Sequence, residues 1–410
     1  MELIFWAAVA LFALLTPWVV ARRRLRVVLV GLPAATLILL AWLGSGMGIR
    51  GFANWLAGPE RSLPLSAMAL TLALIYYRRW TRPWPAGCLL VAASTVMVAG
   101  LFDPHFQGIV SRPDNVPIVL LAGAVAWFFW VGLRRAAVND DRRERGLPVW
   151  ESGSDDRVMT WPNLVYLEWL AMILCTVVLL IWSILLRAPL EPPANPGAVP
   201  NPAKAPWYFL GLQELLVYFD PWLAGVMVPL LIILGLCAIP YLDRNPKGNG
   251  YYTFRDRPLA VVIFLAGFGL LWVPLIVIGT FLRGPNWSLF GPFEPWDPHR
   301  SAALVNVNLS DLFWNKLAGS GLPTDSVVTW PRVLWREIPG LLLLMAIFVV
   351  VPWVLRRTLL RRLARRQGAA RYRVTMFLLA GMILIPLKMV LHWTLGLKYI
   401  LDLGEWGINL

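Results

Sequence analysis

The sequence predicts an all-α, polytopic integral membrane protein with about ten transmembrane helices. Three observations predict this fold: 58% of the 410 residues are hydrophobic, only 15% are charged, and the apolar residues gather in runs long enough to cross a bilayer. A soluble chain needs more polar cover for its surface. The formal net charge is +14, but no nucleic-acid-binding motif accompanies it. We therefore expect no nucleic-acid partner.

Ten apolar runs of about 15 to 25 residues supply the expected helices, and the third is the shortest. The first run is followed by Arg22, Arg23 and Arg24. A cleavable signal peptide carries its positive charges before the apolar region, so we expect this first run to remain as a span. The runs lie near residues 2–20, 27–45, 63–77, 86–102, 116–133, 163–186, 222–242, 258–282, 338–355 and 374–396.

The basic residues predict the orientation of the helices. Alternate connections together hold 25 of the 37 Lys and Arg residues. Basic loops resist translocation, so this side is expected to be cytoplasmic. Both termini are then expected on the outer, periplasmic side of a bacterial cytoplasmic (inner) membrane. The basic connections are residues 21–26, 76–85, 134–162, 243–258 and 356–373.

Two connections on the outer side are long, and such connections are usually functional or disordered. The first, residues 187–221, leads into KAPWYFLGLQELLVYFDPW, residues 204–222. This stretch is too short and too polar to cross a hydrocarbon layer of roughly 30 Å. Its Leu210, Glu214 and Tyr218 share one helical stripe. We predict a short helix that lies at the membrane boundary.

Five motifs follow one another between residue 161 and about residue 290. They are WPNLVYLEWL from 161, PLEPPANP from 189, APWYFLGLQELL from 205, PWLAGVMVPLLIILGLCAIPYLDRNP from 221 and RPLAVVIFLAGFG from 257. In this order they resemble the C-terminal half of cytochrome b and its separate counterpart, subunit IV of the cytochrome b-f complex. The expected organisation is a five-helix N-terminal membrane region of unknown role (1–150), a three-helix region with the quinol-site loop (151–290), and a long outer loop with two further spans (291–410).

The resemblance implies a membrane subunit of a quinol-oxidising cytochrome bc-type electron-transfer complex. In that family, an outer loop with a Pro-Glu-Trp-Tyr tetrapeptide contributes to the quinol site. Quinol oxidation needs an aromatic and aliphatic pocket and a positioned proton acceptor. The chain would then be a non-haem subunit of a quinol:electron-acceptor oxidoreductase. The residues expected to wall the pocket are Trp207, Tyr208, Phe209, Leu212, Leu215 and Tyr218.

At the tetrapeptide this sequence departs from the family pattern. Aligning Trp207 and Tyr208 with its last two residues puts Pro206 at the position of the Glu, so the expected carboxylate is absent. Our hypothesis is that Glu214, on the same short helix, takes the role of proton acceptor. Asp220 is a second candidate, toward water. The alternative for Glu214 is a structural hydrogen bond or ion pair at the boundary.

The histidines bear on the cofactors. Two b haems need four axial ligands, but the chain has only His105, His299 and His392. We therefore expect no haem held by this chain alone, and b haems in a partner, a cytochrome b N-terminal-type subunit. An iron–sulfur protein or a c-type cytochrome is the expected acceptor, and lipids are further partners. The expected cofactor is a quinone/quinol of menaquinone type. The three cysteines lie singly, so no metal site is predicted.

Lys388 and His392 lie one turn apart on the expected tenth span. An ionisable group within a span is a functional hypothesis, here a quinone or proton path or a ligand to a haem presented by a partner. The alternative is a Lys that extends to the interface and a satisfied boundary His.

Two other functions fit parts of the sequence. One is a structural or assembly subunit of a respiratory or photosynthetic electron-transfer complex, with a decayed quinol site. The other is a membrane glycosyl or lipid transferase. The isolation of Asp103 and Asp114 speaks against the transferase, which needs an acidic metal or base motif near an outer loop.

Overall fold

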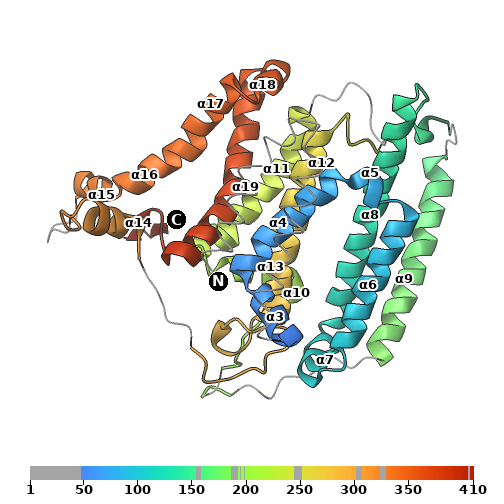
Figure 1. Ribbon diagram of the computed structural model, residues 1–410, viewed down its shortest axis with the longest axis horizontal. Coiled ribbons are helices and arrows are strands. Elements are labelled where there is room, and N and C mark those ends of the chain that lie inside the picture. Colours follow the sequence, from blue (N-terminus) through green and yellow to red (C-terminus); the bar gives the residue numbers. More distant parts are fainter. Residues whose placement is uncertain are drawn as a thin grey trace. The chain divides into compact units, whose positions relative to one another are not determined.

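The described part of the chain is mostly helical in the computed structural model (Figure 1). It divides into two compact units. The first comprises Met1–Ala203, Asn249–Ala266 and Thr280–Pro298, and the second comprises Lys204–Gly248, Gly267–Gly279 and His299–Leu410. The structure describes residues 48–153, 158–185, 193, 195–197, 199–243, 252–301, 307–323, 329–404 and 407–410.

Six helices among the described residues are long and apolar enough to cross a membrane, which makes the chain a multi-pass membrane protein. Each coincides with one of the fifth to tenth predicted runs. The third and fourth runs fall on helices α4 (Pro59–Ile75) and α6 (Pro83–Gly100), whereas the runs at 2–20 and 27–45 lie outside the described residues. The count of ten spans and the side of the termini stay predictions. The six helices are Val116–Glu144, Thr160–Leu185, Leu223–Leu242, Pro258–Leu282, Ile338–Arg357 and Ala369–Leu395.

The first unit contains three long helices, α6, α8 and α9, that run in roughly the same direction (Figure 1). No residue of α9 is buried, so its whole apolar surface is available to lipid or to another chain. The elements of this unit are α3 (Gly48–Ala57), α4 (Pro59–Ile75), α5 (Tyr77–Trp80), α6 (Pro83–Gly100), α7 (Pro104–Val110), α8 (Val116–Glu144), η3 (Trp150–Gly153), η4 (Thr160–Leu164), α9 (Val165–Leu185), α12 (Pro258–Phe264) and η8 (Pro285–Trp287).

Two fully buried polar residues tie the end of α8 to the rest of this unit. Asp140 accepts hydrogen bonds from the Tyr77 hydroxyl (2.8 Å) and from the main-chain N–H groups of Phe254 (3.1 Å) and Arg255 (3.2 Å). Asn139 accepts from the N–H of Trp150 (2.9 Å) and donates to the carbonyl of Tyr252 (2.9 Å) and to the Glu151 carboxylate (2.7 Å). Burial of these groups is tolerated because their hydrogen bonds are made within the protein.

The second unit packs around α19, and its apolar core contains Leu384, Leu397 and Ile400. Gly340 lies directly against the carbonyl of Ile400, where a Cβ atom has no room. The last residues form an antiparallel ladder in which Asp402 pairs with Asn409. The elements are α10 (Trp207–Leu215), η5 (Leu223–Met227), α11 (Val228–Leu242), α13 (Val273–Val277), α14 (Leu309–Asp311), η9 (Leu312–Leu317), α15 (Trp330–Arg336), α16 (Ile338–Met345), η10 (Ala346–Val350), α17 (Val351–Arg357), α18 (Arg361–Gln367), α19 (Ala369–Leu395), β1 (Asp402–Leu403) and β2 (Ile408–Asn409).

Three spans contain a π-helical segment immediately before a proline. The segment η5 precedes Pro229, η6 (Leu265–Trp272) precedes Pro274, and η10 precedes Pro352. Proline has no N–H, and its ring clashes with the carbonyl four residues earlier, so a widened turn accommodates it within a continuous helix. The helix from Pro258 to Leu282 ends in a further π-helical segment, η7 (Ile278–Leu282), and contributes residues to both units.

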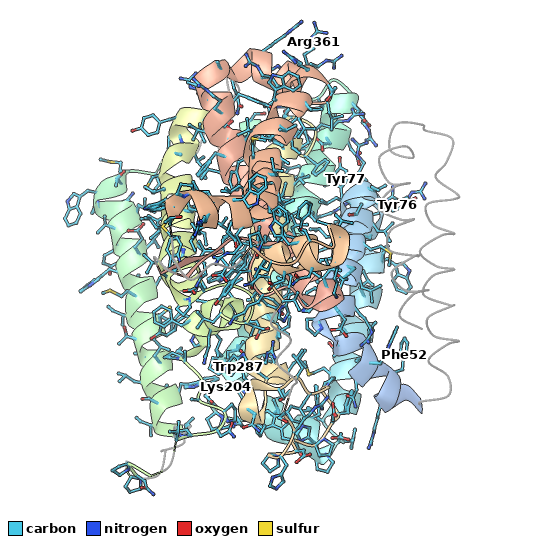
Figure 2. All side chains as sticks on the ribbon, turned by 90° about the vertical axis from the view of Figure 1, so that its left-hand side faces the viewer. Phe52, Tyr76, Tyr77, Lys204, Trp287 and Arg361 are labelled. Atoms are coloured by element: carbon cyan, nitrogen blue, oxygen red, sulfur yellow. The ribbon has the colours of Figure 1, made fainter. Side chains whose placement is uncertain are left out.

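The second unit has its basic cluster and the start of α10 at opposite ends. Figure 2 shows Arg361, the first residue of α18, at one end of this unit and Lys204, just before α10, at the other. This is the arrangement expected if the connections at 187–221 and 356–373 lie on opposite sides of the membrane.

Candidate functional site around helix α10

The short helix expected within residues 204–222 is α10, from Trp207 to Leu215. Pro206 occupies its N-cap, with an extended conformation, and its carbonyl accepts a hydrogen bond from Phe209 at 2.8 Å. The main-chain N–H of Ala205 donates to the side chain of Gln213 at 2.9 Å. Proline therefore starts the helix at the position where the family has its carboxylate.

One face of α10 is buried. The predicted stripe of Leu210, Glu214 and Tyr218 is 3%, 0% and 2% exposed, and Leu215 is buried beside it. This face packs on α13. Gly279 allows the close approach, since a Cβ atom there would lie 3.0 Å from the carbonyl oxygen of Leu210. The position of Glu214 thus depends on small residues at the contact between two helices.

Tyr218 links the buried carboxylate to α19. Its hydroxyl donates to Oε1 of Glu214 at 3.3 Å, and its ring meets His392 and Trp393 edge-on, with centroid distances of 5.4 and 5.8 Å. Nδ1 of His392 lies 3.2 Å from the carbonyl oxygen of Leu397. A carbonyl can only accept, so this nitrogen carries the proton in that hydrogen bond. Sequence reasoning singled out Glu214 and His392 separately and missed that Tyr218 contacts both.

Lys388 lies one turn before His392 and is completely buried. Its ammonium donates to the carbonyl of Lys398 and, at 3.4 Å, to that of Leu410. The ring of Tyr399 lies 5.8 Å from the same nitrogen. The side chain therefore does not reach solvent, because two main-chain carbonyls of the segment after α19 accept its hydrogen bonds. Both interpretations of Lys388, a functional group and a residue at the interface, stay hypotheses.

The aromatic side chains at the start of α10 are exposed. Trp207, Tyr208 and Phe209 are 40%, 51% and 51% exposed, and neighbouring rings contact each other at centroid distances of 5.7 and 4.7 Å. By helical periodicity, Tyr208 and Phe209 lie more than 100° around α10 from Glu214. Leu212 is half-buried. The structure therefore does not bring all the expected pocket residues to one face.

Asp220 follows α10 at the entry to the span Leu223–Leu242. Its carbonyl accepts from the N–H groups of Leu223 and Ala224, each at 3.0 Å, and its carboxylate accepts from the Asn409 amide at 3.2 Å. The side chain is partly exposed, so this second candidate is the more accessible of the two.

The histidines are dispersed over the described part of the chain. His105 contacts Trp296 edge-on with a centroid distance of 6.1 Å, while His392 contacts Tyr218. No three His, Cys, Asp or Glu side chains among the described residues form a group that could hold a metal ion.

One known family matches the segment that contains α10. Residues 193–293 match the family model described as cytochrome b (C-terminal)/b6/petD. The predicted resemblance is confirmed. The matched segment contains α10 and the two spans that follow it, whereas α9 lies before it. The match supports a membrane subunit of the cytochrome b or b6-f type, and the family implies a quinone-binding role, other subunits, and haem in the wider complex. No solved structure matches the chain. The three-region division of the chain stays a prediction.

Proposed function

We propose that this chain is a subunit of a quinol-oxidising cytochrome bc-type complex in a bacterial cytoplasmic membrane and forms part of its outer-face quinol site. The observation that carries the proposal is the position of Glu214. It is a completely buried carboxylate on the short helix of the family-matched segment, in contact with a tyrosine hydroxyl. Buried acids beside polar partners are characteristic of proton-transfer sites.

The chemistry requires a group that accepts protons as quinol is oxidised. Pro206 cannot do so, because proline has no titratable group. In this proposal Glu214 accepts the proton, Tyr218 orients the carboxylate, and the more accessible Asp220 passes the proton toward water. Two observations support these roles. The Tyr218 hydroxyl donates to Glu214 at 3.3 Å, and the side chain of Asp220 is partly exposed.

The exposed aromatic side chains supply the surface for the other components. The aromatic rings of Trp207, Tyr208 and Phe209 are exposed and contact one another. Burying them against a quinone ring or a partner subunit would stabilise the complex. With Leu212 they form one wall of the site, and Leu215 and Tyr218 support it from behind. The redox centres belong to partners in this proposal: b haems in a cytochrome b N-terminal-type subunit, and an iron–sulfur protein or c-type cytochrome as acceptor. The quinone is of menaquinone type.

The test is the Glu214→Gln variant in the assembled complex. The amide keeps the shape but cannot accept the proton, so we expect quinol oxidation to slow by about a hundredfold. Assembly of the complex should not change. Glu168→Gln is a matched control, since Glu168 is exposed on α9 and outside the site. An unaltered rate and an unaltered pH profile for Glu214→Gln would exclude the proposed role.

A second candidate function is a structural or assembly subunit with a decayed quinol site. Pro206 at the position of the family carboxylate and the placement of Tyr208 away from Glu214 favour it. In that case Glu214→Gln leaves turnover intact, whereas Tyr208→Ala lowers the yield of assembled complex. Retained assembly with lost turnover in Glu214→Gln distinguishes the first function from the second.

A further inference from the structure

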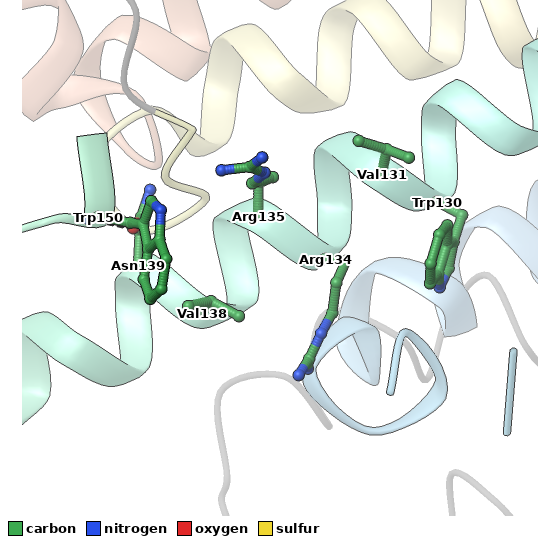
Figure 3. A pocket seen from close by; sticks show the side chains of 7 residues that line it. All are labelled: Trp130, Val131, Arg134, Arg135, Val138, Asn139 and Trp150. Carbon is green, nitrogen blue, oxygen red and sulfur yellow. Dashed lines mark hydrogen bonds between the residues drawn. The ribbon is translucent and has the colours of Figure 1, made fainter. Parts of the chain in front are cut away.

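An open pocket of about 400 Å³ lies in the first unit, at the basic end of α8 (Figure 3). It lies outside the family-matched segment and far along the chain from α10. Its lining combines indole rings, aliphatic side chains and two guanidinium groups. The lining residues are Trp130, Val131, Arg134, Arg135, Val138, Asn139 and Trp150.

Helical spacing places these side chains in two rows. Trp130, Arg134 and Val138 follow one another at intervals of four residues, and a second row with the same spacing begins at Val131. Figure 3 shows Arg134 extending from α8 between Trp130 and Val138. Trp150 of η3 closes one end.

The indole of Trp130 and the main chain of Trp150 are each anchored by a hydrogen bond. Trp130 donates through Nε1 to the carbonyl of Thr81 at 3.0 Å. Trp150 donates through its main-chain N–H to the fully buried Asn139 at 2.9 Å. The wall formed by Trp130 is therefore held in place before any ligand binds, and the backbone that carries Trp150 is fixed beside it.

The positive charge in the pocket is poorly compensated. Arg134 makes no hydrogen bond or ion pair with any residue that the structure describes. Arg135 forms a long ion pair with Glu151, at 4.0 Å, and its side chain is 53% exposed. Both guanidiniums can thus offer N–H donors to an anion, and a phosphate oxygen matches their planar geometry.

The pocket lies where α8 changes from apolar to basic. Trp127 and Phe128 lie about one turn before the first lining residues, and their side chains are 53% and 68% exposed. The charged part of the helix begins at Arg134. Tryptophan and arginine side by side are typical of the boundary between hydrocarbon and headgroups. A ligand here meets positive charge on one side and a lipid-facing apolar surface on the other.

We propose that this pocket binds an anionic phospholipid. The phosphate diester accepts hydrogen bonds from Arg134, Arg135 adds positive charge from another side of α8, the headgroup lies between Trp130 and Trp150, and the acyl chains continue along Val131 and Phe128. Inorganic phosphate can accept the same hydrogen bonds as the headgroup, but it has no acyl chains to bind the apolar surface, so it should bind more weakly. The inference does not depend on the proposed quinol chemistry.

The test uses the full chain in phosphatidylcholine nanodiscs doped with phosphatidylglycerol that carries a photoactivatable diazirine near the headgroup. Cross-linked peptides are mapped by mass spectrometry. We expect labelling within residues 127–150, and Arg134→Gln should lower it about fivefold, the value for one basic contact at a lipid surface. Arg365→Gln, which removes an exposed Arg of α18, is the matched control and should leave this labelling unchanged.

Two further variants separate ligand binding from folding. Arg134→Lys keeps the charge and should retain most of the labelling, whereas Val138→Trp keeps both arginines but fills the pocket and should abolish it. Equal labelling by a phosphatidylcholine diazirine probe, or labelling unaffected by Arg134→Gln and Val138→Trp, overturns the proposal. Displacement of the lipid probe by inorganic phosphate overturns it as well, because the site would then select a free anion.

Discussion

The carboxylates of Asp140 and Glu214, in the part of the chain that the structure describes, are both completely buried but held in different ways. Asp140 accepts from a hydroxyl at 2.8 Å and from two main-chain N–H groups that come from a segment far along the chain. The contact between Glu214 and Tyr218 is longer, 3.3 Å, and joins residues only four apart. A long hydrogen bond between residues so close in the sequence adds little to folding.

This difference indicates that Asp140 has a structural role, whereas Glu214 is a candidate for proton transfer. Asp140 joins α5 and the segment before α12 to the end of α8, so its loss should appear as lost stability. The Tyr218 contact of Glu214 orients a carboxylate that the fold has buried through the packing of α10 on α13. Its loss should appear mainly in turnover.

The largest effect is expected for Asp140→Ala. It leaves the Tyr77 hydroxyl and two main-chain N–H groups without their acceptor, and each unsatisfied group is costly. We expect the free energy of unfolding to fall by about 3 kcal/mol. Thermal unfolding of the detergent-solubilised chain measures this. Asp141→Ala is the matched control, because the side chain of Asp141 is 44% exposed. If both substitutions lowered the unfolding free energy equally, the structural role proposed for Asp140 would be contradicted.

Gly279→Ala should move the Glu214 helix without changing any charge. The new Cβ would lie 3.0 Å from the carbonyl oxygen of Leu210, so α10 has to shift. We expect a loss of about 1 to 2 kcal/mol in unfolding free energy and slower quinol oxidation in the assembled complex. Gly381→Ala on α19 is the control, since its Cβ meets no atom within 4 Å. If turnover were unchanged in Gly279→Ala, the exact position of α10 would not matter for quinol oxidation.

Tyr77→Phe tests the first carboxylate alone. It removes one hydroxyl donor of Asp140 and leaves the two N–H donors in place. The expected loss of unfolding free energy is about 1 kcal/mol, again measured by thermal unfolding. No measurable change would mean that the main-chain donors suffice.

Tyr218→Phe is the same substitution at the second carboxylate and should have the smallest effect on stability. Because the bond it removes is long, we expect no more than about 0.5 kcal/mol in unfolding free energy. Quinol oxidation should nevertheless slow, and its pH profile should shift. A stability loss larger than that of Tyr77→Phe would reverse the comparison between the two acids.

The spans were predictable because hydrophobic length is a local property of the sequence. The run at 163–186 became the helix Thr160–Leu185, and the stretch around Glu214 became α10 with its predicted stripe buried. The run at 116–133 was predicted too short. Its helix continues to Glu144 through RRAAVNDDRRE, in which the alanines, arginines and glutamate favour a helix and the buried Asn139 and Asp140 are fixed by hydrogen bonds to other segments.

The candidate site was predictable only in part. Glu214 and His392 each stood out as ionisable groups in apolar surroundings, but their meeting at Tyr218 depends on how α19 packs in the second unit. Lys388 shows the same limit. Its carbonyl partners belong to the segment after α19, and nothing in its neighbours on the helix predicts them.

The length of α8 has a consequence for where this protein resides. Its 29 residues extend about 43 Å at 1.5 Å per residue, well beyond a hydrocarbon layer of roughly 30 Å. The arginines begin where the apolar part ends, so they mark the thickness of membrane that the helix fits. A thicker bilayer would draw Arg134 toward hydrocarbon at a cost for every ångström of mismatch. The apolar length of α8 therefore favours membrane regions whose hydrocarbon thickness matches it.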